Sequence, residues 1–406
     1  MEKQLFHINE LCVKVTDGSH FSPVESVDGN YPMFSVKDME YNGFSYENCK
    51  YIDLETYKVL ERNDCRPLKN DILIAKDGSY LKCVFKVKED MDVCILSSIA
   101  ILRPNVKVID PDYFVYLLRT KSIKSAMASY VSGSALPRII LSDFKKMKLN
   151  LFENINYQKL ISNTLIKYDT LIENNNNRIK LLENIAEELY KEWFVRFRFS
   201  GYKNTEFENG IPKSWRFAKL NDIALEVDKP INKENRYQYK YYVPIDCLPN
   251  KSMGLVDVDN IENAESSLIT FQKKNILFGA MRPYFHKVIY SPIEGITRTT
   301  CFVLDAKNDL YREWLYLTMY QQFTVDFANT VSVGSTMPYV RWKDLNRMKV
   351  CIPSKDIIVR FNSFIQPILN KINSYFEINK NLIKQRDSLL PRLMSGKLSV
   401  EGKEII

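Results

Sequence analysis

The sequence predicts an α+β fold in which two tandem globular units are joined and followed by two long helices that pair as an antiparallel coiled coil. Three observations carry this prediction. One phrase occurs twice about half the chain apart, a helical seam pattern follows each copy, and 45% hydrophobic with 26% charged residues are typical of a globular protein. At 406 residues the chain also exceeds what one ordinary core accommodates.

The repeated phrase reads SGSALPRIILSDFKKMKLNL at Ser132–Leu151 and VGSTMPYVRWKDLNRMKVCI at Val333–Ile352. Six residues are identical in the two copies: a glycine, a serine, a proline, an aspartate, a methionine and a lysine. Each pair is separated by the same number of positions as Gly133 and Gly334. Three further pairs of similar segments precede the two copies, and their spacing predicts strand, strand and helix: DILIA and NILFG (71–75 and 275–279), SSIAIL and TTCFVL (97–102 and 299–304), YFVYLLRT and EWLYLTMY (113–120 and 313–320). The order strand, strand, helix, Gly-Ser loop, strand is therefore predicted twice.

A coiled-coil seam follows each unit, because apolar residues alternate at spacings of four and three from Ile161 to Trp193 and again from Phe361 to Leu393. At a rise of 1.5 Å per residue, each seam would be about 50 Å long. The helices most simply pair with each other, although each could instead pair with a helix of another subunit. The seam positions expected to pair are Ile172, Asn175, Ile179, Leu182, Leu189, Ile372, Tyr375, Asn379, Leu382 and Leu389.

Polar and imino residues interrupt both seams. An asparagine such as Asn175 or Asn379 fixes the register of a seam at some cost in stability, or else the apolar stripe rotates past that turn. Pro367 is expected to kink the second helix or to mark a start nearby. Alternate aromatic residues from Trp193 to Phe199 indicate that the end of the first helix docks onto the second unit.

These patterns divide the chain into five segments. The predicted boundaries are unit one at 1–152, the central long helix at 153–199, unit two at 200–353, the C-terminal long helix at 354–396 and a polar tail at 397–406.

Composition bears on the partners and the compartment of the protein. The net charge of +8 is thinly spread, since 1–152 holds 21 Lys+Arg against 20 Asp+Glu and 201–353 holds 20 against 17, so any nucleic-acid surface must be a local patch. No run reaches the roughly 20 apolar residues of a membrane helix, and the first residues lack the apolar core of a signal peptide, which favours the cytoplasm. In that compartment the eight scattered cysteines are expected to be reduced and buried.

Motifs that would carry catalysis are missing from the sequence. The three histidines, His7, His20 and His286, have no metal-ligand spacing, and there is no C-x-x-C pair, P-loop, dinucleotide fingerprint, nucleophile elbow or adenine-methyltransferase signature. We therefore expect this chain to be non-catalytic and to bind no metal. Two other classes stay open: a structural adaptor whose helices join protein partners, and a nuclease with an unrecognised site.

Several ordered phrases resemble the specificity (S) subunit of type I restriction-modification enzymes. They are LLENIAEELYKEWFVRFRFSGY (Leu181–Tyr202), similar to that family's central segment, GIPKSWRFAKLNDIA (Gly210–Ala224), similar to the opening of its second recognition unit, and RDSLLPRLMSGKLSV (Arg386–Val400), similar to its closing segment. AKDGS (Ala75–Ser79) and the two Gly-Ser-x-x-Pro loops also fit. The resemblance spans essentially the whole chain.

The resemblance implies a DNA-binding subunit with two target-recognition domains, each of which reads one half of a split site in double-stranded DNA. The paired helices would hold these domains a set distance apart and bind two methyltransferase (M) subunits. Restriction (R) subunits would join this complex. It implies no cofactor for this chain, whereas S-adenosylmethionine, ATP and Mg would serve the partner subunits in DNA methylation and cleavage. Arg386 is unusual at a dry seam position and could face a methyltransferase subunit instead.

Candidate DNA-binding residues gather mainly around the repeated loops, since base readout needs donors and acceptors that enter the major groove. Arginines could contact guanine, whereas serines would hold phosphate. The alternation of tyrosines with polar residues in 236–242 predicts a half-buried strand. Its exposed face would carry Arg236 and Lys240 as a row of phosphate-binding side chains. The simpler alternative is that Gly-Ser-x-x-Pro is only a turn and that the charged residues are solvated. The full set is Lys76, Asp77, Ser79, Ser134, Arg138, Arg236, Lys240, Arg282, Tyr284, Ser335 and Arg341.

Overall fold

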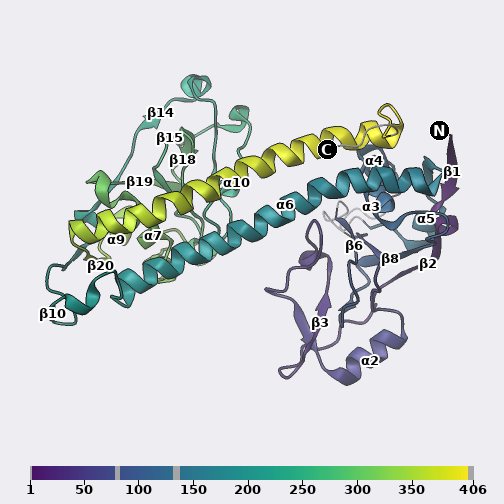
Figure 1. Cartoon of the computed structure of the whole chain (residues 1–406), viewed down its shortest axis with the longest axis horizontal. Coiled ribbons are helices and arrows are strands. Elements are labelled where there is room, and N and C mark those ends of the chain that lie inside the picture. The colour runs from purple at the N-terminus through teal and green to yellow at the C-terminus, as the bar shows by residue number, and fades with distance from the viewer. Residues whose placement is uncertain (1, 78–82, 131–137, 401–406) are drawn as a thin grey trace. The chain divides into compact units, whose positions relative to one another are not determined.

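The computed structural model describes residues 2–77, 83–130 and 138–400, and the chain forms two compact units (Figure 1). Unit 1 comprises 1–170 together with 383–406, and unit 2 comprises 171–382. The sequence-based boundaries gave each long helix a segment of its own. In the structure each long helix is divided between the two units, because its residues pack on whichever globular part is adjacent.

Unit 1 is built on a four-stranded antiparallel sheet with the order β2-β8-β5-β6 (Figure 1). Two smaller sheets accompany it: β1 pairs with β9, and β4-β3-β7 contains one parallel pair, β3 with β7. The strands are β1 Lys3–His7, β2 Cys12–Asp17, β3 Tyr31–Phe34, β4 Lys50–Ile52, β5 Ile72–Ala75, β6 Val84–Lys86, β7 Cys94–Ile95, β8 Ile99–Pro104 and β9 Lys148–Phe152. The helices are α1 Ile8–Leu11, a 3₁₀ helix Val36–Asp38, α2 Leu54–Arg62, α3 Pro111–Arg119, α4 Lys121–Ser129 and α5 Leu141–Lys146.

The central sheet of unit 1 is buried on both faces, which explains why its strands are apolar at successive positions. In β5, Ile72 and Ile74 join the cluster beneath α3, whereas Leu73 and Ala75 join a second cluster around Phe34. Successive side chains of a strand point to opposite faces, so a strand covered on both sides reads as a continuous apolar run.

Unit 2 repeats this arrangement with a four-stranded antiparallel sheet in the order β13-β19-β16-β17. The predicted equivalences are confirmed, since β5 matches β16, β8 matches β19, α3 matches α7 and β9 matches β20. The strands are β10 Phe207–Glu208, β11 Ile211–Pro212, β12 Arg216–Lys219, β13 Ala224–Glu226, β14 Pro230–Ile231, β15 Leu268–Phe271, β16 Ile276–Gly279, β17 Val288–Tyr290, β18 Gly295–Arg298, β19 Cys301–Ala306 and β20 Lys349–Ile352. The α-helices are α7 Arg312–Tyr320, α8 Gln322–Thr330 and α9 Trp342–Leu345, and the 3₁₀ helices are Tyr202–Asn204, Leu220–Asp222, Lys233–Gln238, Ile245–Cys247, Ile261–Asn263, Pro283–Phe285 and Asp309–Tyr311.

The two units share a two-stranded antiparallel sheet, β1-β9 in unit 1 and β12-β20 in unit 2, but they differ in their three-stranded sheets. The β14-β15-β18 sheet of unit 2 is wholly antiparallel, whereas β4-β3-β7 of unit 1 contains a parallel pair. The repeated part is therefore the central sheet with its helix and the two-stranded sheet, and the outer part of each unit, which contains the three-stranded sheet, has diverged.

The two long helices are α6, Ile155–Tyr190, which continues as a π-helical turn at Lys191–Val195, and α10, Lys355–Ser395. Within unit 2, Asn175 contacts Asn379 and Trp193 contacts Phe361, so residue numbers rise along one helix as they fall along the other. The helices therefore pair with each other and run antiparallel, as predicted. Helix α10 continues past Pro367, so this proline does not mark its start.

The seam positions differ in burial. Ile179 and Ile372 are buried, Leu182, Leu189 and Tyr375 pack against the core of unit 2, and Ile172 and Leu382 are half-buried. Leu389 packs against the core of unit 1. The Asn175 amide donates to the Asn379 side-chain oxygen at 2.9 Å, and the Asn379 amide in turn donates to the side-chain oxygen of Asn176 at 2.8 Å.

The end of α6 docks onto unit 2, which confirms the interpretation of the aromatic stretch. Trp193 and Phe194 are buried and lie against Phe361, and Phe194 also contacts Trp215 and Trp314. No helix among the described residues is long and apolar enough to cross a membrane. The eight cysteines are free thiols, and burial raises the pKa of Cys94 to about 12.

The Asn175–Asn379 pair yields a first testable prediction. We expect Asn379→Ala to lower the free energy of unfolding of unit 2 by about 1–3 kcal/mol, because the Asn175 amide then stays buried without its acceptor. The double variant N175L/N379L should recover most of this loss. Unfolding in urea can be followed by tryptophan fluorescence, since all four tryptophans lie in unit 2. A double variant that loses the sum of both single losses would contradict this account.

Candidate nucleic-acid interface

In unit 2, the segment after β16 lies beside the Gly-Ser loop. The Val340 amide donates to the Ala280 carbonyl at 3.0 Å, and the Arg282 amide donates to the Pro338 carbonyl at 2.7 Å. Val333 and Tyr339 exchange two backbone hydrogen bonds of 3.0 and 2.9 Å, which close the loop as a hairpin. The structure thus brings together two segments that are far apart in the sequence, and both carry predicted DNA-binding residues.

The turn that follows β16 has an unusual backbone. Arg282 and His286 both adopt left-handed conformations, with φ of 50° and 53°, on either side of the short 3₁₀ helix Pro283–Phe285. Such conformations cost roughly 1–2 kcal/mol for residues other than glycine, so the surrounding structure must hold them. Strained backbone of this kind is concentrated at functional sites.

The buried side chain of His286 attaches this turn to the end of α7. This side chain is 6% exposed, and its Nε2 lies 2.7 Å from the Tyr320 carbonyl at the end of α7. The His286 carbonyl also accepts a hydrogen bond of 2.9 Å from the Lys251 amide. Burial is the main cause that lowers the pKa of His286 from 6.5, and the nearby Lys251 charge acts in the same direction.

Three apolar side chains of the turn and the neighbouring hairpin, Tyr284, Phe285 and Met337, are exposed, and we call them the exposed tip. Tyr284 is 52% exposed and Phe285 39% exposed, with their ring centroids 4.8 Å apart, and Met337 of the adjacent hairpin is 57% exposed. Sequence reasoning selected Tyr284 and missed Phe285 and Met337. Their only signal was their place inside the repeated loops, where an apolar residue reads as core until its exposure is known.

Three polar candidates of unit 2 belong to the same two segments as these apolar residues. Arg282 belongs to the strained turn and is half-buried, and Ser335 is exposed in the hairpin. Arg341 directly precedes α9, and its Nε lies 2.6 Å from the Asp344 carboxylate. This pair leaves the Arg341 side chain 47% exposed, so part of the guanidinium remains accessible.

In unit 1 the same two segments are paired in the same way. The Ile139 amide donates to the Lys76 carbonyl at 2.9 Å, which reproduces the bond from Val340 to Ala280 in unit 2. Asp77 and Arg138 face each other across a β-bridge and form an ion pair of 3.1 Å. Ser79 and Ser134 lie outside the described residues.

Lys76 is placed differently from the sequence-based expectation. Its side chain is buried at 2% exposure, and its ammonium pairs with the carboxylate of Asp17 on β2. A buried charge needs such a partner. We therefore assign Lys76 to the fold of unit 1 rather than to a surface that touches DNA.

The predicted strand at 236–242 is wrong. Residues Lys233–Gln238 form a 3₁₀ helix, so Arg236 and Lys240 do not lie in a row on one strand face. The Arg236 guanidinium lies 4.7 Å from the Tyr237 ring centroid and donates to its hydroxyl, and the Lys240 ammonium lies 5.1 Å from the Tyr241 ring centroid. The alternating pattern reflects cations stacked on neighbouring rings, since only Tyr242 forms bridges with other strands.

The chemistry of these residues suits recognition. The loops supply guanidinium, hydroxyl and apolar groups, which can contact phosphates, base edges and thymine methyl groups. Within the described ranges, no group of three or more His, Cys, Asp and Glu side chains could hold a metal ion.

The buried His286 leads to a prediction about pH. In the unfolded chain a histidine takes up a proton below about pH 6.5, whereas the native pKa of His286 is lower, so the unfolded state binds more protons below that pH. The stability of unit 2 is thus expected to fall as the pH drops through 6.5. Urea unfolding by tryptophan fluorescence at pH 5.5 and 7.5 measures this slope, which should be smaller in His286→Gln. Equal slopes in the two proteins would contradict it.

Known proteins resemble this chain over most of its length. The family model described as "Type I restriction modification DNA specificity domain" matches residues 2–184 and 212–385. The type I restriction enzyme MjaIX specificity subunit of Methanocaldococcus jannaschii is 26% identical over 309 residues, which cover 71% of this chain and 69% of that relative. The MjaVIII specificity subunit of the same organism is 22% identical over 397 residues, with 93% and 88% covered.

Among solved structures, the S subunit of a type I restriction-modification system from M. genitalium has the same fold. Its TM-score with this chain is 0.60 at 17% sequence identity, and the match covers 97% of this chain and 96% of that one.

Proposed function

Because this chain belongs to the family of type I restriction-modification DNA specificity domains and is a specificity subunit of such a system, we propose that each of its units reads one half of a bipartite DNA site. The family membership confirms the resemblance on which the sequence-based function rested. The two stretches of the family match correspond to the two halves of the internal repeat.

The observation that carries this proposal is the paired-loop arrangement that occurs once in each unit. Both units join the segment after a central strand to the end of a Gly-Ser loop, through the bonds Ile139 to Lys76 and Val340 to Ala280. A duplicated scaffold that presents loops of different sequence suits a protein that reads two different half-sites. The scaffold stays constant while the loop side chains select the bases.

In unit 2 we assign the base contacts to the exposed tip and its neighbours. Arg282 is suited to a bidentate contact with guanine, and the Tyr284 and Phe285 rings to apolar contact with thymine methyl groups in the major groove. Ser335 and Arg341 are suited to phosphate, which would fix the register of the unit on the duplex.

The remaining parts of the proposal concern the partners. Two methyltransferase subunits dock on the helices and supply S-adenosylmethionine chemistry on adenine, and restriction subunits supply ATP- and Mg-dependent cleavage. This chain itself catalyses neither reaction. The paired helices act as the spacer, because two readers must face the same side of B-DNA at a separation set by its turn of about 34–36 Å. A flexible linker would not fix that spacing.

The test uses the chain together with its methyltransferase subunits and S-adenosylmethionine. Adenine N6 methylation is expected at one two-part motif, and that motif should lose its methylation genome-wide when the gene is deleted. Equal methylation of random duplexes would contradict the proposal and favour an adaptor. Metal-dependent cleavage of DNA by the isolated chain would instead favour a nuclease.

A further inference from the structure

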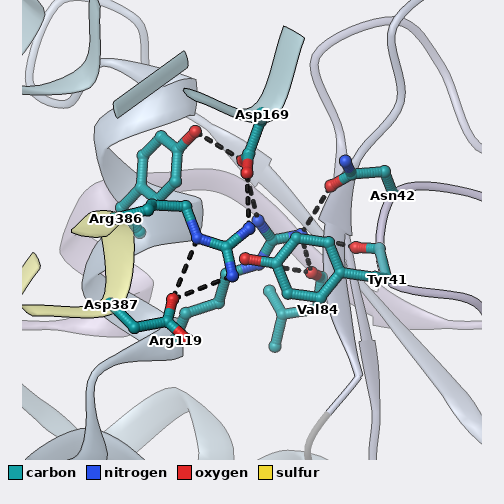
Figure 2. Close-up of polar contacts among 8 residues, drawn as sticks. Tyr41, Asn42, Val84, Arg119, Asp169, Arg386 and Asp387 are labelled. Atoms are coloured by element: carbon teal, nitrogen blue, oxygen red, sulfur yellow. Dashed lines mark hydrogen bonds and ion pairs between the residues drawn. The ribbon is translucent and has the colours of Figure 1, made fainter. Parts of the chain in front are cut away.

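In unit 1, a buried cluster of two arginines holds the loop Tyr41–Asn42 against the long helices (Figure 2). Arg386 of α10 is only 6% exposed and forms ion pairs of 2.6 Å with Asp169 of α6 and 2.8 Å with Asp387. The sequence-based suggestion that Arg386 could face a methyltransferase subunit does not fit this burial. Its guanidinium is instead occupied within unit 1.

The second arginine of the cluster binds the loop directly. Arg119, at the end of α3, donates from Nη2 to the Tyr41 carbonyl at 2.5 Å and to the Asn42 side-chain oxygen at 3.0 Å. The Tyr41 ring faces both guanidinium groups, with its centroid 3.9 Å from the central carbon of Arg119 and 4.7 Å from that of Arg386. Figure 2 shows this ring in front of the two arginines.

The positive charges of Arg119 and Arg386 are balanced by the carboxylates of Asp169 and Asp387. Two buried guanidinium groups lie close together, and the Asp169 carboxylate serves both of them as well as the Tyr116 hydroxyl, which donates to it at 2.6 Å. Removing one partner from a buried charge network leaves another charge unpaired. The cluster therefore ties Tyr41 and Asn42 to Arg119 of α3 and to Arg386 of α10, although Tyr41 stays 47% exposed.

Unit 2 holds a different loop on its own stretch of the helices. Glu183 of α6 accepts hydrogen bonds of 2.7 Å from the Ser252 hydroxyl and from the Met253 amide. The next residue, Gly254, lies so close to Phe376 of α10 that a Cβ atom there would be 1.9 Å from the ring. Only glycine fits at that position without displacing the aromatic side chain.

The two contacts are not copies of each other. At the shift of about 200 that relates the helices, Arg386 corresponds to Ala186 and Asp169 to Leu369, and both of these are buried apolar residues. The ionic cluster is thus particular to unit 1 and the Glu183 contact to unit 2. Each unit has its own means of fixing a loop of its diverged outer part.

We propose that Arg386 and Glu183 are positioning residues for DNA reading, because each attaches the outer part of its recognition unit to the helix segments of the same unit. This inference rests on the proposed function. The physical reason is that side chains which read bases need a support whose own geometry is fixed by packing and hydrogen bonds. Without the attachment, the outer loop of a unit moves and its half-site is read with less discrimination.

The attachment itself can be tested without DNA by hydrogen exchange of the full chain. In Arg386→Met and in the milder Tyr41→Ala, amides in 36–46 are expected to exchange at least about ten-fold faster, while unit 2 is unchanged. Arg62→Met, which alters an exposed arginine of α2 in the same unit, is the matched control and should change nothing in that segment. Unchanged exchange at 36–46 in both test variants would overturn the proposal.

Glu183 allows a conservative rescue. Glu183→Ala should accelerate exchange at 248–258, whereas Glu183→Gln keeps the accepting oxygen and should retain wild-type exchange. If the alanine variant exchanges like the wild type, the assignment for unit 2 is wrong.

A more mobile loop would not by itself prove a role in DNA reading, so the positioning role is tested by measuring how well each half-site is discriminated. With the methyltransferase subunits present, Arg386→Met should lose at least about ten-fold in discrimination at the half-site read by unit 1 and keep discrimination at the other half-site. A loosened loop with unchanged discrimination would overturn the role. A wild-type complex without any sequence preference would instead overturn the proposed function, and the exchange measurements would still decide whether the attachment exists.

Discussion

Replacing Arg282 with alanine is expected to weaken binding to the cognate site by about 1–3 kcal/mol, roughly 5- to 150-fold in affinity. The Arg282 backbone is held in a left-handed conformation and donates to the Pro338 carbonyl, so the fold fixes the point from which this side chain extends. Binding is measured by titration of the complex with its methyltransferase subunits against duplexes that carry substitutions in each half-site, at a fixed salt concentration.

The pattern of the loss matters as much as its size. Only positions in the half-site read by unit 2 should become more tolerant of substitution, and Arg216→Ala, which removes an exposed arginine from β12, should leave both half-sites unchanged. An equal loss for all sequences would show that Arg282 binds phosphate instead of a base. Unchanged binding would remove Arg282 from the interface.

Truncating Phe194 is expected to have the largest effect on stability. Phe194→Ala should lower the free energy of unfolding of unit 2 by about 3–5 kcal/mol, because the ring is buried among Trp215, Trp314 and Phe361 and leaves a cavity there. Urea unfolding followed by tryptophan fluorescence reports this loss, since the probes surround the cavity.

The matched control is Phe217→Ala on β12, where the phenylalanine is 60% exposed and little burial is lost. It should cost less than about 1 kcal/mol. Equal losses in the two variants would mean that the end of α6 is not part of the core of unit 2.

The paired helices and the duplicated units could be predicted because their signals extend over many residues. The seam from Ile161 to Trp193 repeats its period often enough to specify a helix, and a whole phrase recurs at a constant shift. The strand predicted at 236–242 was wrong because that pattern is short. Tyrosines alternating with cations fit a strand or a stacked turn equally well, and only the neighbours of the segment decide between them.

The candidate interface was predictable in its location and less so in its members. The repeated loops marked where the two segments meet, and the structure joins them through backbone bonds that no side-chain pattern encodes. Lys76 shows the limit, since a lysine after a strand looks exposed until Asp17 on another strand is placed beside it. Phe285 shows the converse, because an apolar residue reads as core until the fold leaves it on the surface.

The sequence by itself determined the duplication, the helical seams and the family, whereas the contacts Asn175–Asn379 and Trp193–Phe361 decided that the two helices pair with each other and run antiparallel. Periodicity and repetition act along the chain, so they can be read without coordinates. Only the tertiary structure decided which charges are buried, which loops meet and how Arg386 and Glu183 fasten the outer loops. Burial and charge pairing depend on residues distant in sequence, such as Asp169 and Arg386, whose interaction exists only once the chain has folded.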